Sequence, residues 1–477
     1  MQRTPFVGRT RELQNLELLL TKRSASMVVV RGRRRIGKSR LIAHFAKGKR
    51  FLKFTGLPPT EGTSAQTQRA TFIKQLCKQT GLPPFTMDDW EDLFSLLAQQ
   101  TKDQRVIILL DEISWMGHKD PTFLGKLKNA WDLELSKNPE LIFILCGSVS
   151  TWIEKNLISS TGFFGRFSLY MTLEELPLVD CKTLLAQQGV KTSSSEIFKI
   201  LSVTGGVPWY LEHIQGHLHA DENIKNLCFK PEGILFNEFN LIFHDLFNSL
   251  TPMYKNIVQI LAKGSKCFSD ICNLLNYAKS GIMSKYLDNL INAGFVTRDY
   301  TWNLKDGKLA RLSHFRLADN YIRFYLKYID PRRLQIKNNG FEEISLASLP
   351  QWDAIMGLQF ENLVLKNRKI IHKALNLKAE DILADNPFFQ RKSVRQKGCQ
   401  IDYLIHTRFN TMFVCEVKFS RGEIGPEIIR KMHEKIARIH RPKGFACWPV
   451  LVHVNGVHEK VSNCEDFAAI IDFSDFL

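Results

Sequence analysis

One eight-residue segment constrains the fold of this chain more than any other: Gly32-Arg33-Arg34-Arg35-Ile36-Gly37-Lys38-Ser39 fits the pattern G-x-x-x-x-G-K-[ST]. The apolar run Met27–Val30 leads into it, and the amphipathic stretch Ser39–Phe45 follows it. A buried strand, a glycine-rich turn and a helix in this order build a loop whose N–H groups surround a triphosphate. The segment therefore predicts an α/β fold with a parallel sheet and a phosphate-binding loop.

A second segment places two acids at the end of a strand. The apolar run Val106–Leu110 is followed directly by Asp111 and Glu112. Ligands of parallel sheets bind at the carboxyl ends of the strands. There Asp111, with the Ser39 hydroxyl, would hold Mg²⁺, Lys38 would reach the β- and γ-phosphates, and Glu112 would polarise the attacking water. The pattern predicts Mg²⁺-dependent ATP hydrolysis; the alternative is that the two acids only cap the next helix.

Residues 1–175 alternate short apolar runs with amphipathic stretches. Buried strands are expected at 27–31, 51–54, 106–110 and 141–146, and helices at 64–79, 88–101 and 120–137. Strands that alternate with helices favour a parallel sheet. Residues 176–245 show helical patterns only.

The N-terminal motifs resemble a known family. Phe6-Val7-Gly8-Arg9 and Arg11-Glu12-Leu13 precede the phosphate loop, and together with it they are similar to the archaeal-type ATPases of the AAA+/STAND-related group. The resemblance implies a P-loop ATPase core at 1–175 and a helical lid at 176–245, with ATP and Mg²⁺ as cofactors.

The same resemblance implies roles for three further residues that would contact the nucleotide. Ser148, after the strand at 141–146, matches a sensor of the γ-phosphate. Arg166 matches the segment that bears an arginine finger, and Pro208 matches the lid motif whose proline approaches the nucleotide. Each has an alternative: Ser148 caps a helix, Arg166 is a surface arginine, and the Gly205–Pro208 segment is a helix-ending turn.

The positive charge is concentrated in the middle of the chain. The 477 residues carry a net charge of +17, and residues 241–340 hold fifteen Lys and Arg against seven Asp and Glu. A basic block of this kind indicates a polyanionic partner. The alternative is that the charge serves solubility and faces an acidic neighbouring domain.

The same block has the element order of a winged helix-turn-helix, which we assign to residues 246–340. Helices are expected at Pro252–Lys263, Phe268–Leu275 and Ser280–Ala293, and the Asp306-Gly307 turn predicts a hairpin that forms an exposed wing. Ser280–Ala293 would be the recognition helix. Phosphate contacts to nucleic acid, expected to be duplex DNA, would come from Lys279, Lys285, Arg298, Lys305, Lys308 and Arg311. The alternative is a module that only contacts other domains. The segment 330–340, rich in Arg, Lys and Asn, is the expected linker.

Two neighbouring strands near the C-terminus carry a further group of charges. Gln400–Ile405 and Thr411–Lys418 read as a hairpin. Glu416 and Lys418 lie two residues apart, so their side chains point to the same side, and Asp402 lies on the partner strand. Asp402 and Glu416 would bind Mg²⁺, and Lys418 would orient or deprotonate water.

These residues resemble the PD-(D/E)xK restriction-endonuclease-like fold, an α/β fold that we assign to residues 341–477. The resemblance adds Glu361, on an upstream helix, as a third catalytic acid, although the literal Pro-Asp pair is absent because Pro387 lies fifteen residues before Asp402. It implies a Mg²⁺-dependent nuclease regulated by ATP. Two alternatives stay open: a surface hairpin with a Glu/Lys pair, and an ATPase switch whose C-terminal domain binds DNA or a protein without cleavage.

Composition excludes several other classes of protein. No apolar run approaches the ~18 residues of a membrane helix. The ten cysteines include no Cys-x-x-Cys pair, so neither a disulfide framework nor a zinc site is expected. We expect a soluble, cytoplasmic protein without a membrane partner, either a monomer or a homo-oligomer.

Overall fold

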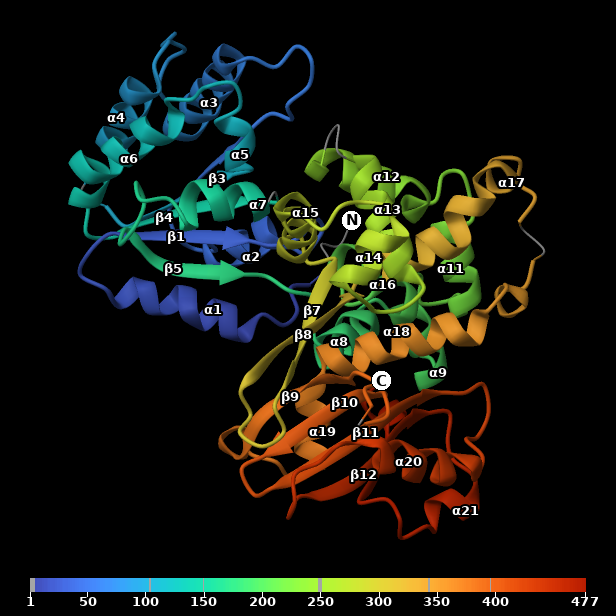
Figure 1. Cartoon of the computed structure of the whole chain (residues 1–477). Coiled ribbons are helices and arrows are strands. Elements are labelled where there is room, and N and C mark those ends of the chain that lie inside the picture. Colours follow the sequence, from blue (N-terminus) through green and yellow to red (C-terminus); the bar gives the residue numbers. More distant parts are fainter. Residues whose placement is uncertain (1–4, 103, 149, 248–250, 342–343, 395) are drawn as a thin grey trace. The chain divides into compact units, whose positions relative to one another are not determined.

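The computed structural model describes residues 5–102, 104–148, 150–247, 251–341, 344–394 and 396–477. The chain divides into two compact units, Phe6–Leu176 and Pro177–Leu477 (Figure 1).

The first unit is built on a five-stranded parallel sheet with strand order β2-β3-β4-β1-β5. Its strands are β1 Ser26–Arg31, β2 Phe51–Thr55, β3 Val106–Asp111, β4 Leu141–Gly147 and β5 Phe167–Thr172. The middle strands β3 and β4 are buried along their whole length. Sheets covered on both faces need continuous apolar strands, which is why the sequence pattern revealed these two.

Helices cover both faces of this sheet. The longer ones are α1 Thr10–Glu17, α2 Lys38–Phe45, α3 Ala65–Thr80, α4 Trp90–Gln100 and α6 Phe123–Leu133, and two single turns are α5 Ile113–Met116 and α7 Ser150–Ile153. Val29 packs into one core with α3, α4 and α6, whereas Val30 packs into a second core with α1 and α2. Figure 1 shows α3, α4 and α6 on one side of the sheet and α1 on the other. The sheet is therefore the middle layer of three.

The four strands expected in this unit are present, but β5 was not expected. Its residues alternate in exposure, and Tyr170 is 48% exposed. β5 lies at the edge of the sheet beside β1, so it needs no continuous apolar run. That placement explains why its sequence pattern is weak.

The second unit begins with helices and continues into a winged helix. Its first five helices are α8 Leu178–Gln187, α9 Ser194–Thr204, α10 Pro208–Leu211, α11 Ala220–Cys228 and α12 Ile234–Phe247. The winged helix consists of α13 Thr251–Ala262, β6 Lys266–Cys267, α14 Phe268–Leu274, α15 Gly281–Asn292, β7 Val296–Trp302 and β8 Leu309–Leu317. These bounds agree with the expected three helices and hairpin.

The expected linker is ordered as helix. α16 Asn320–Phe324 follows the hairpin, and Asp330–Arg332 and α17 Arg333–Lys337 form short helical turns. Arg333 donates hydrogen bonds to the Phe236 carbonyl and to the Asn237 side chain. Expecting a linker here was wrong, because the basic side chain is used to dock the segment on α12.

The C-terminal part is a mixed five-stranded sheet with strand order β13-β12-β11-β10-β9. Its strands are β9 Ile382–Gln390, β10 Cys399–Thr407, β11 Thr411–Phe419, β12 Ala446–Val454 and β13 Ala469–Asp472. Its helices are α18 Trp352–Lys366, α19 Arg368–Ala374, α20 Glu427–Arg438 and α21 Glu459–Ser462. β9, β10 and β11 are antiparallel, and β11, β12 and β13 are parallel. β9 escaped detection because Pro387 and its polar neighbours interrupt the strand pattern.

The wing is exposed only in part, although the sequence suggested an exposed segment between its strands. Trp302 and Leu304 are 3% and 6% exposed and share one core with Phe388, Ile401 and other residues of the C-terminal sheet. The Trp302 indole N–H donates to Nδ1 of His406 at 3.2 Å. The expectation of an exposed segment is wrong at Trp302 and Leu304, because these two apolar side chains are buried against the sheet that follows.

Replacing Trp302 by alanine tests this docking. Loss of the buried indole should lower the free energy of unfolding of the second unit by about 3–5 kcal/mol. Amides of β9 and β10 should exchange faster in hydrogen-exchange mass spectrometry of the full chain. Leu309→Ala on the same hairpin is the control, since Leu309 is 73% exposed. Unchanged protection of β9 and β10 in Trp302→Ala would contradict the docking.

Candidate nucleotide site and C-terminal acidic site

The phosphate loop connects β1 to α2 and depends on two glycines. Gly32 has a φ of 149°, and a Cβ there would lie 2.5 Å from the Leu173 carbonyl oxygen. Gly37, with a φ of 90°, is the last residue before α2. Only glycine adopts both conformations without strain, so the loop turns tightly and presents the N-terminus of α2.

Lys38 folds back over the loop that precedes it. Its side chain is buried, and Nζ donates to the carbonyls of Gly32 at 2.9 Å and Arg33 at 3.0 Å. A buried ammonium needs such acceptors. The lysine is therefore held at the loop, where the sequence pattern places it.

The hydroxyl and the first acid expected to hold Mg²⁺ are in contact. Ser39 Oγ donates to Asp111 Oδ2 at 2.7 Å. Lys53 on β2 also approaches Asp111 Oδ2, with Nζ at 3.0 Å. Sequence reasoning missed Lys53, because nothing in its local pattern marks it. The pairing of β2 with β3 brings it beside the acid.

Glu112, the second acid, accepts hydrogen bonds from Ser148, the residue expected to sense the γ-phosphate. Glu112 adopts a left-handed backbone conformation with a φ of 52°. Its Oε2 accepts hydrogen bonds from Ser148 N at 3.1 Å and Ser148 Oγ at 3.0 Å. The ends of β3 and β4 thus bring Glu112 and Ser148 together, as both were expected to lie at this edge.

The N-terminal motif clamps the loop. The Arg9 guanidinium donates to the Ile36 carbonyl at 3.2 Å and to the Glu174 carbonyl at 2.7 Å. Arg33 is buried and lies 3.7 Å from the Glu175 carboxylate. Arg34 and Arg35 are half-buried. The role of Arg9 was not foreseen, although its motif was recognised.

Arg166 and Pro208 were assigned roles from the family resemblance, and those roles stay predictions. Arg166 forms two 2.7 Å hydrogen bonds to Asp132 on α6, and this pairing lowers the pKa of Asp132 to about 2. An arginine finger at this position would have to leave that carboxylate. Pro208 is the first residue of α10 in the second unit.

The C-terminal acids converge on a lysine that the sequence did not indicate. Lys435 on α20 forms an ion pair with Glu416, and its Nζ lies 3.7 Å from Asp402 Oδ1. Asp402 also accepts a hydrogen bond from Val417 N at 3.0 Å. Burial and the neighbouring Glu416 raise the pKa of Asp402 to about 8.

The other two residues expected at this site differ in placement. Burial raises the pKa of Glu361 on α18, which interacts electrostatically most strongly with Arg323 and Arg316 and less strongly with Glu416 and Lys435. Lys418 is exposed, and no ion pair or hydrogen bond involves its side chain among the described residues. The cation between the two strand acids is Lys435, because α20 packs across β10 and β12.

The described part of the chain holds no group of three or more His, Cys, Asp or Glu arranged to hold a metal ion. All ten cysteines are free thiols. None of the helices in the described ranges is both long and apolar enough to cross a bilayer.

Comparison with protein families defines the class of the N-terminal part. Residues 6–214 match the model of the "ATPase domain predominantly from Archaea", and residues 255–298 match the helix-turn-helix of the "Bacterial regulatory protein, arsR family". The chain therefore carries an archaeal-type P-loop ATPase domain followed by a helix-turn-helix of the ArsR type. The sequence predicted the ATPase domain and a winged helix-turn-helix, but not the ArsR type.

Individual relatives are more distant. The uncharacterized protein MJECL04 of Methanocaldococcus jannaschii is 25% identical over 360 residues, which span 75% of this chain and 76% of the relative. The Walker-type ATPase PABY2304 of Pyrococcus abyssi is 17% identical with a TM-score of 0.49, covering 67% of this chain and 96% of that chain. The Aeropyrum pernix ORC2 protein is 14% identical with a TM-score of 0.45, covering 71% and 97%.

Removing the Arg9 clamp should weaken nucleotide binding. Arg9→Ala deletes two charged hydrogen bonds that hold the loop, so we expect the affinity for a fluorescent ADP analogue to fall by roughly 10-fold. Arg11→Ala is the control, because Arg11 is exposed on the neighbouring turn. Equal affinity of Arg9→Ala and Arg11→Ala would show that the clamp is dispensable.

Proposed function

We propose that this protein is a Mg²⁺-dependent ATPase whose nucleotide state controls binding of nucleic acid. The observation that carries the proposal is the convergence of Ser39, Asp111, Glu112 and Ser148 beside the phosphate loop. These four groups come from the loop and the ends of two adjacent parallel strands. Such an arrangement supports cleavage of a phosphoanhydride.

Binding of a triphosphate would exchange internal contacts for phosphate contacts. The Lys38 ammonium now donates to two loop carbonyls and can donate instead to the β- and γ-phosphate oxygens. Ser39 and Asp111 offer two hard oxygen ligands in contact, which fits Mg²⁺. When bound there, Mg²⁺ neutralises the charge that develops on the phosphates.

Glu112 would act as the base that orients the attacking water. In the structure both its hydrogen bonds on Oε2 come from Ser148. A γ-phosphate offers the Ser148 donors a more highly charged acceptor. Transfer of those hydrogen bonds would free Glu112, so the Ser148 contact couples the presence of ATP to the availability of the base.

The winged helix supplies the nucleic-acid contacts in this proposal. All six cations predicted to contact phosphates are exposed. Arg298 is also held in place, since it donates to Ser313 and stacks on Tyr300. Lys285 on α15 and Lys305 and Lys308 at the hairpin turn stay exposed. Lys308 lies 3.7 Å from the Asp306 carboxylate, and the exposed lysines can serve as phosphate contacts.

A second candidate function is hydrolysis of phosphodiesters at the C-terminal acidic site. The pairing of Asp402 and Glu416 around Lys435 supports it. Two facing carboxylates fit Mg²⁺, which when bound lowers the pKa of water. Glu361 would be the third acid of the site, and Lys418 or Lys435 would hold the scissile phosphate. In the alternative, the same surface binds DNA or a protein without cutting.

ATP hydrolysis should depend on the loop lysine and on the second acid. Lys38→Ala should abolish nucleotide binding, and Glu112→Gln should keep binding while lowering turnover by roughly 100-fold or more. Phosphate release and binding of labelled ATP measure the two effects. Lys47→Ala, an exposed lysine just after α2, is the control. Wild-type turnover by Lys38→Ala would refute the site.

Nuclease activity should require Asp402. Asp402→Ala should abolish nicking of a plasmid with Mg²⁺ or Mn²⁺ and leave ATPase activity unchanged. Glu380→Ala, at an exposed acid of the same domain, should cut like wild type. If wild type cuts in no nucleotide state, the binding-only alternative holds instead.

A further inference from the structure

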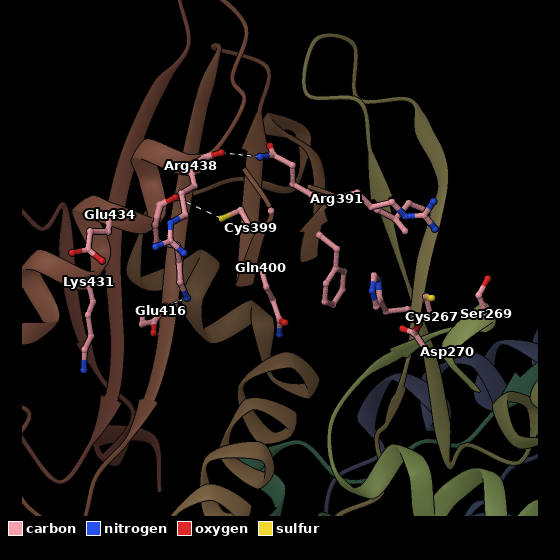
Figure 2. Close-up of a pocket in the computed structure, with 16 residues that line it drawn as sticks. Cys267, Ser269, Asp270, Arg391, Cys399, Gln400, Glu416, Lys431, Glu434 and Arg438 are labelled. Carbon is pink, nitrogen blue, oxygen red and sulfur yellow. Dashed lines mark hydrogen bonds and ion pairs between the residues drawn. The ribbon is translucent and has the colours of Figure 1, made fainter. Parts of the chain in front are cut away.

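A cavity of 910 Å³ lies inside the second unit, between the winged helix and the C-terminal sheet (Figure 2). One wall is formed by the start of α14 and by β8, with Ser269, Asp270 and His314. The opposite wall is formed by the adjoining ends of β9 and β10 and by α20. Glu416 and Lys435 line the same cavity, so it opens on the acidic site.

The wall formed by the sheet and α20 carries cations that no acid neutralises. Arg391, Lys431 and Arg438 all line the cavity and are exposed. Among the described residues, none of the three side chains takes part in an ion pair or a hydrogen bond. Lys431, Lys435 and Arg438 follow one another at helical spacing, so they form one stripe along α20.

The acids of the cavity do not cancel this charge. Glu416 pairs with Lys435, and Glu434 pairs with Arg430 on its own helix. Only Asp270, on the winged-helix wall, lacks a described ion pair or hydrogen bond. The surface of the cavity around Arg391 and Arg438 therefore attracts anions.

The cationic wall is held in position by the backbone. Gln390 donates from Nε2 to the Arg438 and Lys397 carbonyls, both at 2.7 Å, and its Oε1 accepts from His440 N at 2.8 Å. These bonds tie the end of α20 to the end of β9. The backbone at Arg391 and Arg438 is thus held in place, and the Arg391 side chain extends toward the hairpin while Arg438 lies at α20 (Figure 2).

Two stacked rings, those of His314 and Phe389, also line the cavity. The rings of His314 and Phe389 stack with centroids 3.7 Å apart and an interplanar angle of 23°. Burial lowers the pKa of His314, which favours the neutral imidazole. Phe389 is 8% exposed, so the accessible ring of this pair is that of the half-buried His314. A ring beside cations is the arrangement that binds single nucleic-acid strands, with the cations on the phosphates and the ring against a base.

The cavity is too small for a duplex and cannot easily widen. Its 910 Å³ lies at the upper end of the ~300–1,000 Å³ range of pockets that enclose a small ligand. That volume admits a few nucleotides of one strand. The hairpin that contributes His314 is fixed to the sheet by Trp302 and Leu304 in the shared core. Opening the walls would break that core.

We propose that this cavity binds a single nucleic-acid strand, with its phosphates on Arg391, Lys431 and Arg438, and leads it to Asp402 and Glu416. The inference rests on the proposed function for the choice of ligand, but binding needs neither cleavage nor ATP. It assigns duplex binding and single-strand binding to different surfaces: α15 and the hairpin turn for duplex, the cavity for one strand.

The test is fluorescence anisotropy of the full chain with labelled dT12, rU12 and a 12-base-pair duplex in EDTA, which prevents cutting. A triple variant, Arg391→Glu with Lys431→Glu and Arg438→Glu, should bind the single strands at least 10-fold more weakly. Loss of three contacts should reduce the single-strand salt slope by about 2. Duplex affinity should change less than twofold.

A matched triple variant, Lys285→Glu with Lys305→Glu and Lys308→Glu, should show the reverse pattern. A second cavity variant carries Gln at the same three positions. It removes the phosphate contacts without adding the negative charges of Glu, which would repel the phosphates. Unchanged circular dichroism and an unchanged thermal unfolding curve of the second unit show that each variant is folded. Wild-type single-strand affinity in the cavity variants, or equal loss of strand and duplex binding, would overturn the inference.

Asp402→Ala separates this inference from the nuclease proposal. It should lose cleavage and keep dT12 binding. If wild type never cuts but the cavity variant loses single-strand binding, the cavity assignment stands and the nuclease fails. If wild type cuts and the cavity variant binds dT12 normally, the opposite holds.

Discussion

The second unit depends on one docked hairpin. Trp302 and Leu304 leave the winged helix and complete the core of the C-terminal sheet. Beside them, Arg316 forms a buried ion pair with Asp299 and donates to Asn362 on α18. A buried ion pair adds little net stability, but breaking it is costly, so it fixes orientation. The winged helix and the sheet therefore act as one body, and the cavity between them has rigid walls.

Charged groups at both candidate sites are satisfied by the protein itself. Lys38 donates to loop carbonyls, Glu112 accepts from Ser148, and Glu416 is paired with Lys435. Each internal partner offers a weaker interaction than a phosphate or a divalent cation would. A phosphate can thus take over the hydrogen bonds of Lys38 without leaving that buried ammonium unpaired. This arrangement gives each site a resting state from which a ligand can switch it.

The features that could be predicted from the sequence are those determined by a local pattern of residues. β3 and β4 were foreseen because they are apolar throughout, and Ser39, Asp111 and Glu112 because the motif spacing is specific. β5 and β9 were missed, since an edge strand and a strand containing Pro387 have weak patterns. Lys53, Lys435 and Trp302 were missed for another reason. Their partners lie far away in the chain, and only strand register or helix packing brings them together.

The central claim is that nucleotide state controls nucleic-acid binding. The most direct measurement is the affinity of Glu112→Gln for a labelled duplex at fixed salt, with saturating ATP and with ADP. The account predicts a difference of about 5-fold or more between the two nucleotides, and none for Lys38→Ala. Equal affinities in ATP and ADP, in a variant shown to bind both, would contradict it.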